Sequence, residues 1–110
     1  MALNKMTIDT VLKRMVRRIV RKFNPEQVIL FGSYARGDAD TDSDVDLLVV
    51  MNIKGSKRRQ QLQVRTALRE RTVPVDVIIT RPEDFVWRKD VFGTMEWPAT
   101  HEGRVLYARK

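Results

Sequence analysis

Three short, nearly continuous apolar runs divide this otherwise charged chain, and polar or turn-forming residues bound each of them. They predict buried strands at residues 27–31, 45–51 and 75–80, because strands covered on both faces lack polar alternation. A shorter fourth strand is predicted at residues 105–107. With helical segments before and between the strands, we expect an α+β fold: a mixed β-sheet of about four strands with helices packed on it.

Residues 7–23 form the clearest predicted helix. Their apolar positions follow the i, i+3, i+4, i+7 spacing of an amphipathic helix. We expect Thr7 to cap this helix, and Asn24-Pro25 to end it, because the residue before a proline avoids helical geometry. Further helices are predicted at residues 33–36, 57–71 and 82–90. Residues 92–102 are left unassigned because Pro98 interrupts them.

The size and composition indicate one soluble domain over residues 1–110. The chain is 43% hydrophobic and 32% charged, as globular proteins are. It has no cysteine, which excludes disulfides and thiolate metal sites. No apolar run approaches the roughly 20 residues of a membrane span, and the N-terminus lacks the apolar segment of a signal peptide. We therefore expect a cytoplasmic protein with no membrane contact.

The charge is unevenly distributed, although the formal net charge is +7. Six basic residues lie on the first predicted helix: Lys13, Arg14, Arg17, Arg18, Arg21 and Lys22. Such a stripe fits RNA or an acidic partner surface, and it equally fits a solvated helix face. Five aspartates between residues 38 and 46 form an acidic stretch instead.

Between the first two predicted strands, the sequence from Gly32 to Asp46 reads GSYARGDADTDSDVD, which is Gly-Ser, ten residues, then Asp-x-Asp. Gly32 lets the chain turn tightly after a strand. Ser33 can cap a short helix, and the free N–H groups at such a helix start attract phosphate oxygens. The first half of the motif therefore predicts a phosphate-binding turn.

Asp44 and Asp46 are two residues apart at the entry to a strand, so both should project from the same face. Asp76 lies within another predicted strand. Three neighbouring carboxylates repel one another, and a hard divalent cation such as Mg²⁺ or Mn²⁺ relieves that repulsion. We therefore predict that these three bind metal, and that Asp76 helps to accept a proton from an attacking hydroxyl. Asp38, Asp40 and Asp42 are predicted to be ordinary loop residues.

Together, Gly32, Ser33, Asp44, Asp46 and Asp76 resemble the motif of the DNA polymerase β-type nucleotidyltransferase superfamily. The ending EGRVLY and the short length resemble its minimal branch, the MNT-domain proteins. The resemblance implies the palm-like nucleotidyltransferase fold, with Mg²⁺ and ATP as ligands. It implies that Asp44 and Asp46 bind two ions and that Asp76 completes one of the two sites. It also implies that Gly32 and Ser33 hold the triphosphate, and that the basic position after Gly-Ser, Arg36, contacts phosphate.

The same resemblance implies a partner. Minimal members are typically encoded beside a helical HEPN-domain ribonuclease toxin, and act as its antitoxin by adding AMP from ATP to a tyrosine. Two alternatives stay open: a binding module that neutralises the ribonuclease simply by covering it, or an enzyme that modifies RNA ends or a small molecule. Among the remaining residues, Trp87 and Trp97 are predicted in the core or an interface. Glu96 and Glu102 are predicted to be ordinary surface residues, and His101 is predicted to be a structural or surface residue.

Overall fold

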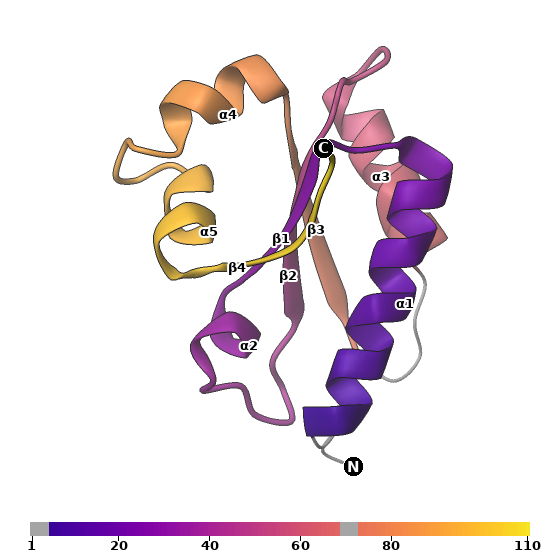
Figure 1. Cartoon of the computed structure of the whole chain (residues 1–110), viewed down its shortest axis with the longest axis vertical. Helices are drawn as coiled ribbons and strands as arrows, with labels where there is room; N and C mark the ends of the chain where they lie inside the picture. Colours follow the sequence, from indigo (N-terminus) through magenta and orange to yellow (C-terminus); the bar gives the residue numbers. More distant parts are fainter. Residues whose placement is uncertain (1–4, 69–72) are drawn as a thin grey trace.

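A computed structural model of the chain describes residues 5–68 and 73–110, and it contains one mixed four-stranded sheet (Figure 1). The strands are β1 (Gln27–Phe31), β2 (Val45–Val50), β3 (Val75–Thr80) and β4 (Arg104–Ala108), in the order β3-β2-β1-β4. β1 is antiparallel to β2 and to β4, whereas β2 and β3 are parallel. The predicted α+β fold is therefore confirmed.

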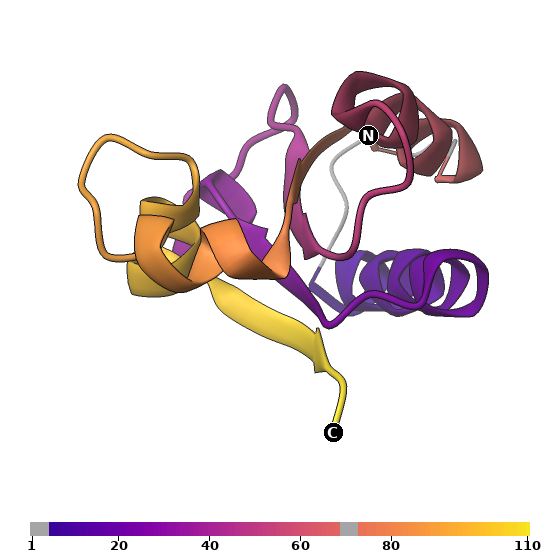
Figure 2. The ribbon, with the colours of Figure 1, turned by 90° about the horizontal axis from the view of Figure 1, so that it is seen from above.

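Helices cover both faces of the sheet, as the apolar strands predicted (Figure 2). On one face lie α1 (Lys5–Phe23) and α3 (Lys57–Ala67). On the other lie α4 (Pro82–Arg88) and α5 (Glu96–Glu102). A short helix, α2 (Ser33–Arg36), follows β1 at the lower end of the sheet in Figure 1.

Strand alternation divides the core into two clusters. On β2, Leu47 and Val49 pack in the cluster that includes Met15 of α1. Leu48 and Val50 pack in the cluster beneath α4 and α5. Because side chains alternate along a strand, Asp46 shares the face of Leu48 and Val50. The carboxylate predicted to act in catalysis therefore projects from the α4–α5 side of the sheet.

Helix predictions differ from the structure in several places, one of which is the end of α4, at Arg88 instead of residue 90. α1 already includes Lys5, so Thr7 lies within the helix rather than capping it. Pro98 lies in the first turn of α5 and does not interrupt it, because N–H groups of the first turn have no intrahelical acceptor to lose. α3 was predicted to continue to residue 71; it ends at Ala67 with Leu68 as its C-cap, and residues 69–71 lie outside the described residues. None of the helices described is long and apolar enough to cross a membrane.

Candidate active site

The turn after β1 depends on glycine for two reasons. Gly32 has φ +75° and ψ −158°, a combination that residues with a side chain essentially never adopt. A Cβ atom built on Gly32 would also overlap the carboxylate of Asp46 and lie 3.1 Å from its Cγ. The bare backbone of Gly32 is therefore seated against Asp46, and the two halves of the sequence motif are in direct contact.

Ser33 does not cap α2 as predicted. Gly32 occupies the N-cap position, Ser33 is the first helical residue, and no side chain caps this helix. A serine could not take the N-cap position here, because only glycine tolerates the backbone conformation at that position. The Ser33 hydroxyl has no hydrogen bond to any other described residue, so it remains available to a ligand.

Asp46 and Asp76 face each other across parallel strands. They are register partners in the pairing of β2 with β3, so their side chains emerge side by side on one face. Asp44 lies just before β2 and is exposed. Burial raises the pKa of the Asp46 carboxyl, the negative charges of Asp76 and Asp44 raise it further, and the positive charge of Arg36 partly opposes them. The three predicted carboxylates thus interact electrostatically.

An arginine that the sequence interpretation missed contacts this group. Nη2 of Arg65, on α3, donates to Oδ1 of Asp76 at 3.1 Å, and both side chains are about half exposed. α3 packs along the edge strand β3, where the side-chain oxygen of Gln61 accepts the N–H of Ile79 at 3.1 Å. The way α3 packs along β3 decides which of its basic residues reaches the site. The periodicity of the α3 sequence gives no information about that packing.

The acidic loop between α2 and β2 organises itself. The Asp40 carboxylate accepts the N–H of Asp42 at 2.9 Å and the Ser43 hydroxyl at 3.2 Å. Arg36 pairs with Asp38, its Nε lying 3.3 Å from Oδ2. Asp38, Asp40 and Asp42 lie in this exposed loop, where they were predicted. The hydrogen bonds of Asp40 stay within the loop, as is usual for aspartate in turns.

The donor set suits a hard divalent cation by its chemistry. The three carboxylates offer only anionic oxygen donors, the kind that Mg²⁺ or Mn²⁺ neutralises, and the pKa of Asp46 is raised by burial and by the charges of Asp76 and Asp44. As their side chains are placed, no three acidic or histidine side chains of the described residues are close enough to share one ion. Asp44, Asp46 and Asp76 therefore fit the metal by donor type and charge, and not by the present separation of their side chains.

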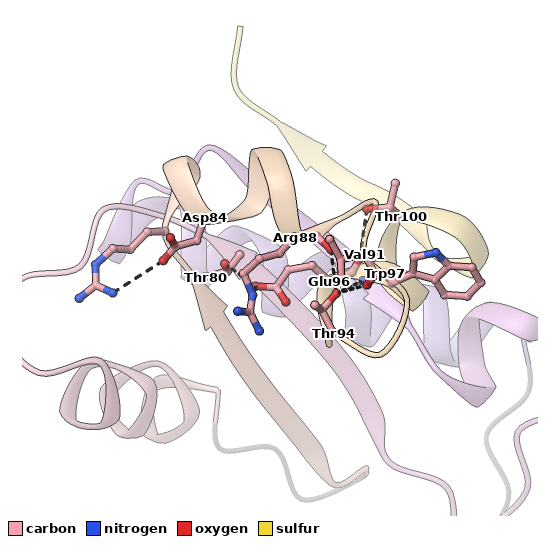
Figure 3. A network of polar contacts seen from close by, with 9 residues as sticks. Thr80, Asp84, Arg88, Val91, Thr94, Glu96, Trp97 and Thr100 are labelled. Atoms are coloured by element: carbon pink, nitrogen blue, oxygen red, sulfur yellow. Dashed lines mark hydrogen bonds and ion pairs between the residues drawn. The ribbon is translucent and has the colours of Figure 1, made fainter.

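Glu96 corrects another prediction, because it was expected at the surface and is buried. It begins α5 with a side chain that is 4% exposed (Figure 3). Oε2 accepts the Thr80 hydroxyl at 2.7 Å and Nε of Arg88 at 3.0 Å. It thereby connects α5 to β3 and α4. Trp87, predicted in the core or an interface, is 56% exposed and therefore not in the core.

Comparison with known proteins agrees with the class that this geometry indicates. The fold and its site define an α+β domain of the nucleotidyltransferase type. Residues 12–99 match the family described as nucleotidyltransferase domain. The chain therefore belongs to the nucleotidyltransferase domain family, and it is an enzyme of that kind.

Several relatives are more specific in name. A Methanocaldococcus jannaschii protein named "Putative protein adenylyltransferase" is 30% identical over 105 residues, covering 93% of this chain and 100% of that protein. A second one from the same organism, with the same description, is 35% identical over 77 residues, or 68% and 77% of the two chains. "Protein adenylyltransferase MntA" of Thermococcus cleftensis is 40% identical over 42 residues, or 38% and 42%.

A solved structure supports the fold independently. The crystal structure of "a putative nucleotidyltransferase from Sulfolobus solfataricus" matches with a TM-score of 0.64, covering 99% of this chain and 93% of that one. At 22% identity, this likeness shows the shared fold alone.

Proposed function

We propose that this enzyme transfers AMP from ATP to a tyrosine hydroxyl of a HEPN-type partner toxin, and that it thereby acts as an antitoxin. The carrying observation is the pairing of Asp46 with Asp76 at the entry of two parallel strands, with the backbone of Gly32 against Asp46. The names of three relatives, all protein adenylyltransferases, support the choice of AMP and of a protein acceptor.

In the proposed reaction, the acceptor oxygen forms a bond to the α-phosphorus, the bond between that phosphorus and the bridging oxygen to the β-phosphate breaks, and pyrophosphate leaves. Asp76 helps to accept the hydroxyl proton. Asp44, Asp46 and Asp76 would hold Mg²⁺ or Mn²⁺, which supplies charge neutralisation at the phosphates. Most of the remaining catalysis is the positioning of the reacting groups.

The triphosphate is assigned to the turn beside these carboxylates. The Ser33 hydroxyl, which has no partner among the described residues, and the first N–H groups of α2 would bind phosphate oxygens. Arg36 would exchange its exposed pairing with Asp38 for a phosphate, since an exposed ion pair of this kind is weak. The acceptor tyrosine would enter from the solvent side, where Asp44 is exposed.

The test compares two aspartates of the same segment. Asp46→Asn should lower transfer of label from α-³²P ATP to the purified HEPN-type partner by about 1,000-fold, because several kcal/mol of charge stabilisation are lost. Asp42→Asn removes the same charge from the loop and should retain near wild-type transfer. Undiminished labelling with Asp46→Asn would refute the site.

Co-expression with the toxin separates catalysis from simple binding. A variant with Asp44, Asp46 and Asp76 all changed to Asn should fail to rescue growth, although it should still fold. Rescue by this variant would instead show that covering the ribonuclease is sufficient. Labelled RNA or a labelled small molecule in place of labelled partner would assign a different acceptor.

A further inference from the structure

We propose that the groove between α1 and α3 binds the phosphate backbone of a nucleic-acid strand, an activity beyond the proposed transfer reaction. The two helices lie side by side on the face of the sheet opposite α4 and α5 (Figure 2). From Thr10 to the end of α1 there is no acidic residue, and α3 contains none at all. Both walls of the groove therefore carry charge of a single sign.

The groove consists of two adjoining hollows. One, of about 530 Å³, is lined by Arg14, Arg17, Arg18, Arg21, Lys22 and Ala67. The next, of about 670 Å³, shares Lys22 and Ala67 with it and adds Arg59 and Gln63 of α3. Because they share these two residues, the hollows form one continuous basic channel between the helices.

Five cations of this channel differ from most arginines elsewhere in the described residues, because they form no ion pair with a carboxylate. Arg36, Arg65, Arg81, Arg88, Arg104 and Arg109 each pair with a carboxylate. Within the described ranges, Arg17, Arg18, Arg21, Lys22 and Arg59 pair with none. Like charges three and four residues apart on a helix, such as Arg17 and Arg21, destabilise it. An external polyanion would relieve this repulsion and displace the counter-ions that gather there.

The lining favours nucleic acid over a protein surface. The centre of a protein interface is apolar and depleted of charged residues. Here the walls are mainly Arg, Lys and Gln, with Leu62 of α3 as an exposed apolar residue among them. Most other exposed apolar residues gather elsewhere, on α4 and the segment before α5: Val86, Trp87, Val91, Phe92 and Met95. Guanidinium groups match phosphate oxygens in pairs. Arg14 and Arg21 are separated by about 10 Å along the helix axis, which spans about three phosphates of a stacked strand.

Fluorescence anisotropy with labelled strands of about 16 nucleotides tests the proposal, using single-stranded RNA, single-stranded DNA and duplex in parallel. No nucleotide triphosphate or divalent metal is added, so the result is independent of the transfer reaction. With about four phosphate contacts, affinity for a single strand should fall about 50-fold between about 50 mM and about 200 mM salt. The strand bound most tightly identifies the source of the phosphates.

Matched triple variants locate the surface. Arg17→Gln/Arg21→Gln/Arg59→Gln should reduce the slope of log affinity against log salt by about 2. Arg81→Gln/Lys89→Gln/Lys110→Gln removes equal charge away from the groove and should keep the wild-type slope. Glutamine is a good helix former, and circular dichroism should show both variants folded. Ultraviolet crosslinking of the wild-type protein, mapped to α1 and α3 by mass spectrometry, needs no variant.

Four results would overturn the proposal. They are no binding at about 50 mM salt, equal losses in the two triple variants, crosslinks confined to other elements, or polyglutamate of equal charge binding as tightly as the strands. The last result would assign the groove to an acidic protein.

Discussion

Two carboxylates on the same face of the sheet, Asp46 and Glu96, show opposite electrostatics. Glu96 is the more buried, and burial alone acts to raise its pKa. The hydrogen bonds from Thr80 and Arg88 outweigh burial, so the pKa of Glu96 lies below its ordinary value. No side chain of residues 5–68 or 73–110 donates to Asp46 in a comparable way, and burial together with the charges of Asp76 and Asp44 raises its pKa.

The difference separates a structural carboxylate from one suited to a ligand. A buried acid that already accepts bonds from donors of the protein stabilises the fold and has little capacity left for a cation. A part-buried acid among like charges gains from an added cation. The burial of an acidic side chain therefore does not indicate a ligand-binding role, whereas the charges around that side chain do.

Removal of Glu96 should have the largest effect on stability. Glu96→Ala leaves the hydroxyl of Thr80, a residue that is 1% exposed, without its acceptor and Arg88 without its counter-ion. We expect a loss of about 3 kcal/mol in the free energy of unfolding, measured with urea. Glu102→Ala, at the exposed end of the same helix, is the control and should cost less than about 0.5 kcal/mol. Equal losses of stability in the two variants would show that Glu96 has no special structural role.

Gly32→Ala should affect the other carboxylate. It introduces a side chain where φ is +75° and pushes the Asp46 carboxylate aside. We expect the free energy of unfolding to fall by about 2 kcal/mol and the rate of transfer to fall more than about tenfold. Gly37→Ala is the matched control, because Gly37 also has positive φ, +84°, but has open space around it. It should cost about 1 kcal/mol. Full transfer by Gly32→Ala would show that the position of Asp46 is not critical.

Much of the fold was predictable because strand cores and the first helix carry strong periodic signals. The predicted bounds of β1, α2 and β3 agree with the structure, and both faces of the sheet are covered as expected. α5 was missed because Pro98 is a strong helix breaker in isolation. Its place in the first turn makes it harmless, and that place depends on where the chain leaves the preceding loop.

The site was predictable only in part. Gly32 stands out as a turn residue directly after a strand, and Asp44, Asp46 and Asp76 stand out because carboxylates within or beside apolar runs are unusual. Arg65 and Glu96 did not stand out, because their partners, Asp76 and Thr80, are brought to them by the packing of helices on the edge strand β3. A single sequence contains no local signal for contacts of this kind.

The pH dependence of stability should have opposite signs for the two acids. The raised pKa of Asp46 favours folding only while the group is protonated, so above its ordinary pKa of 3.8 its ionisation opposes folding. Asp46→Asn should therefore stabilise the protein at neutral pH, and this gain should vanish in acid. The lowered pKa of Glu96 stabilises the fold above its ordinary value of 4.5, and that stabilisation is lost as pH falls through the folded pKa. Glu96→Gln should therefore cost most at neutral pH.

Urea unfolding at a series of pH values, in a chelating buffer that removes divalent cations, measures both effects. Asp42→Asn controls for the loss of one negative charge in the acidic loop. The comparison would fail if the Asp46→Asn and Glu96→Gln differences from wild type changed with pH in the same direction.

The smallest effect on stability is expected for Arg65→Gln. This variant compares two arginine–carboxylate pairs of nearly equal length that differ in exposure. Arg65 lies 3.1 Å from Asp76, and Arg88 lies 3.0 Å from Glu96, but Asp76 is 48% exposed and Glu96 is 4% exposed. Solvent screens the first pair, so Arg65→Gln should cost less than about 0.5 kcal/mol. Arg88→Gln should cost about 2 kcal/mol, because it leaves a buried carboxylate without its counter-ion. Urea unfolding of the two variants side by side measures the difference, and a cost for Arg65→Gln equal to that of Arg88→Gln would mean that the site carboxylates stabilise the fold as Glu96 does.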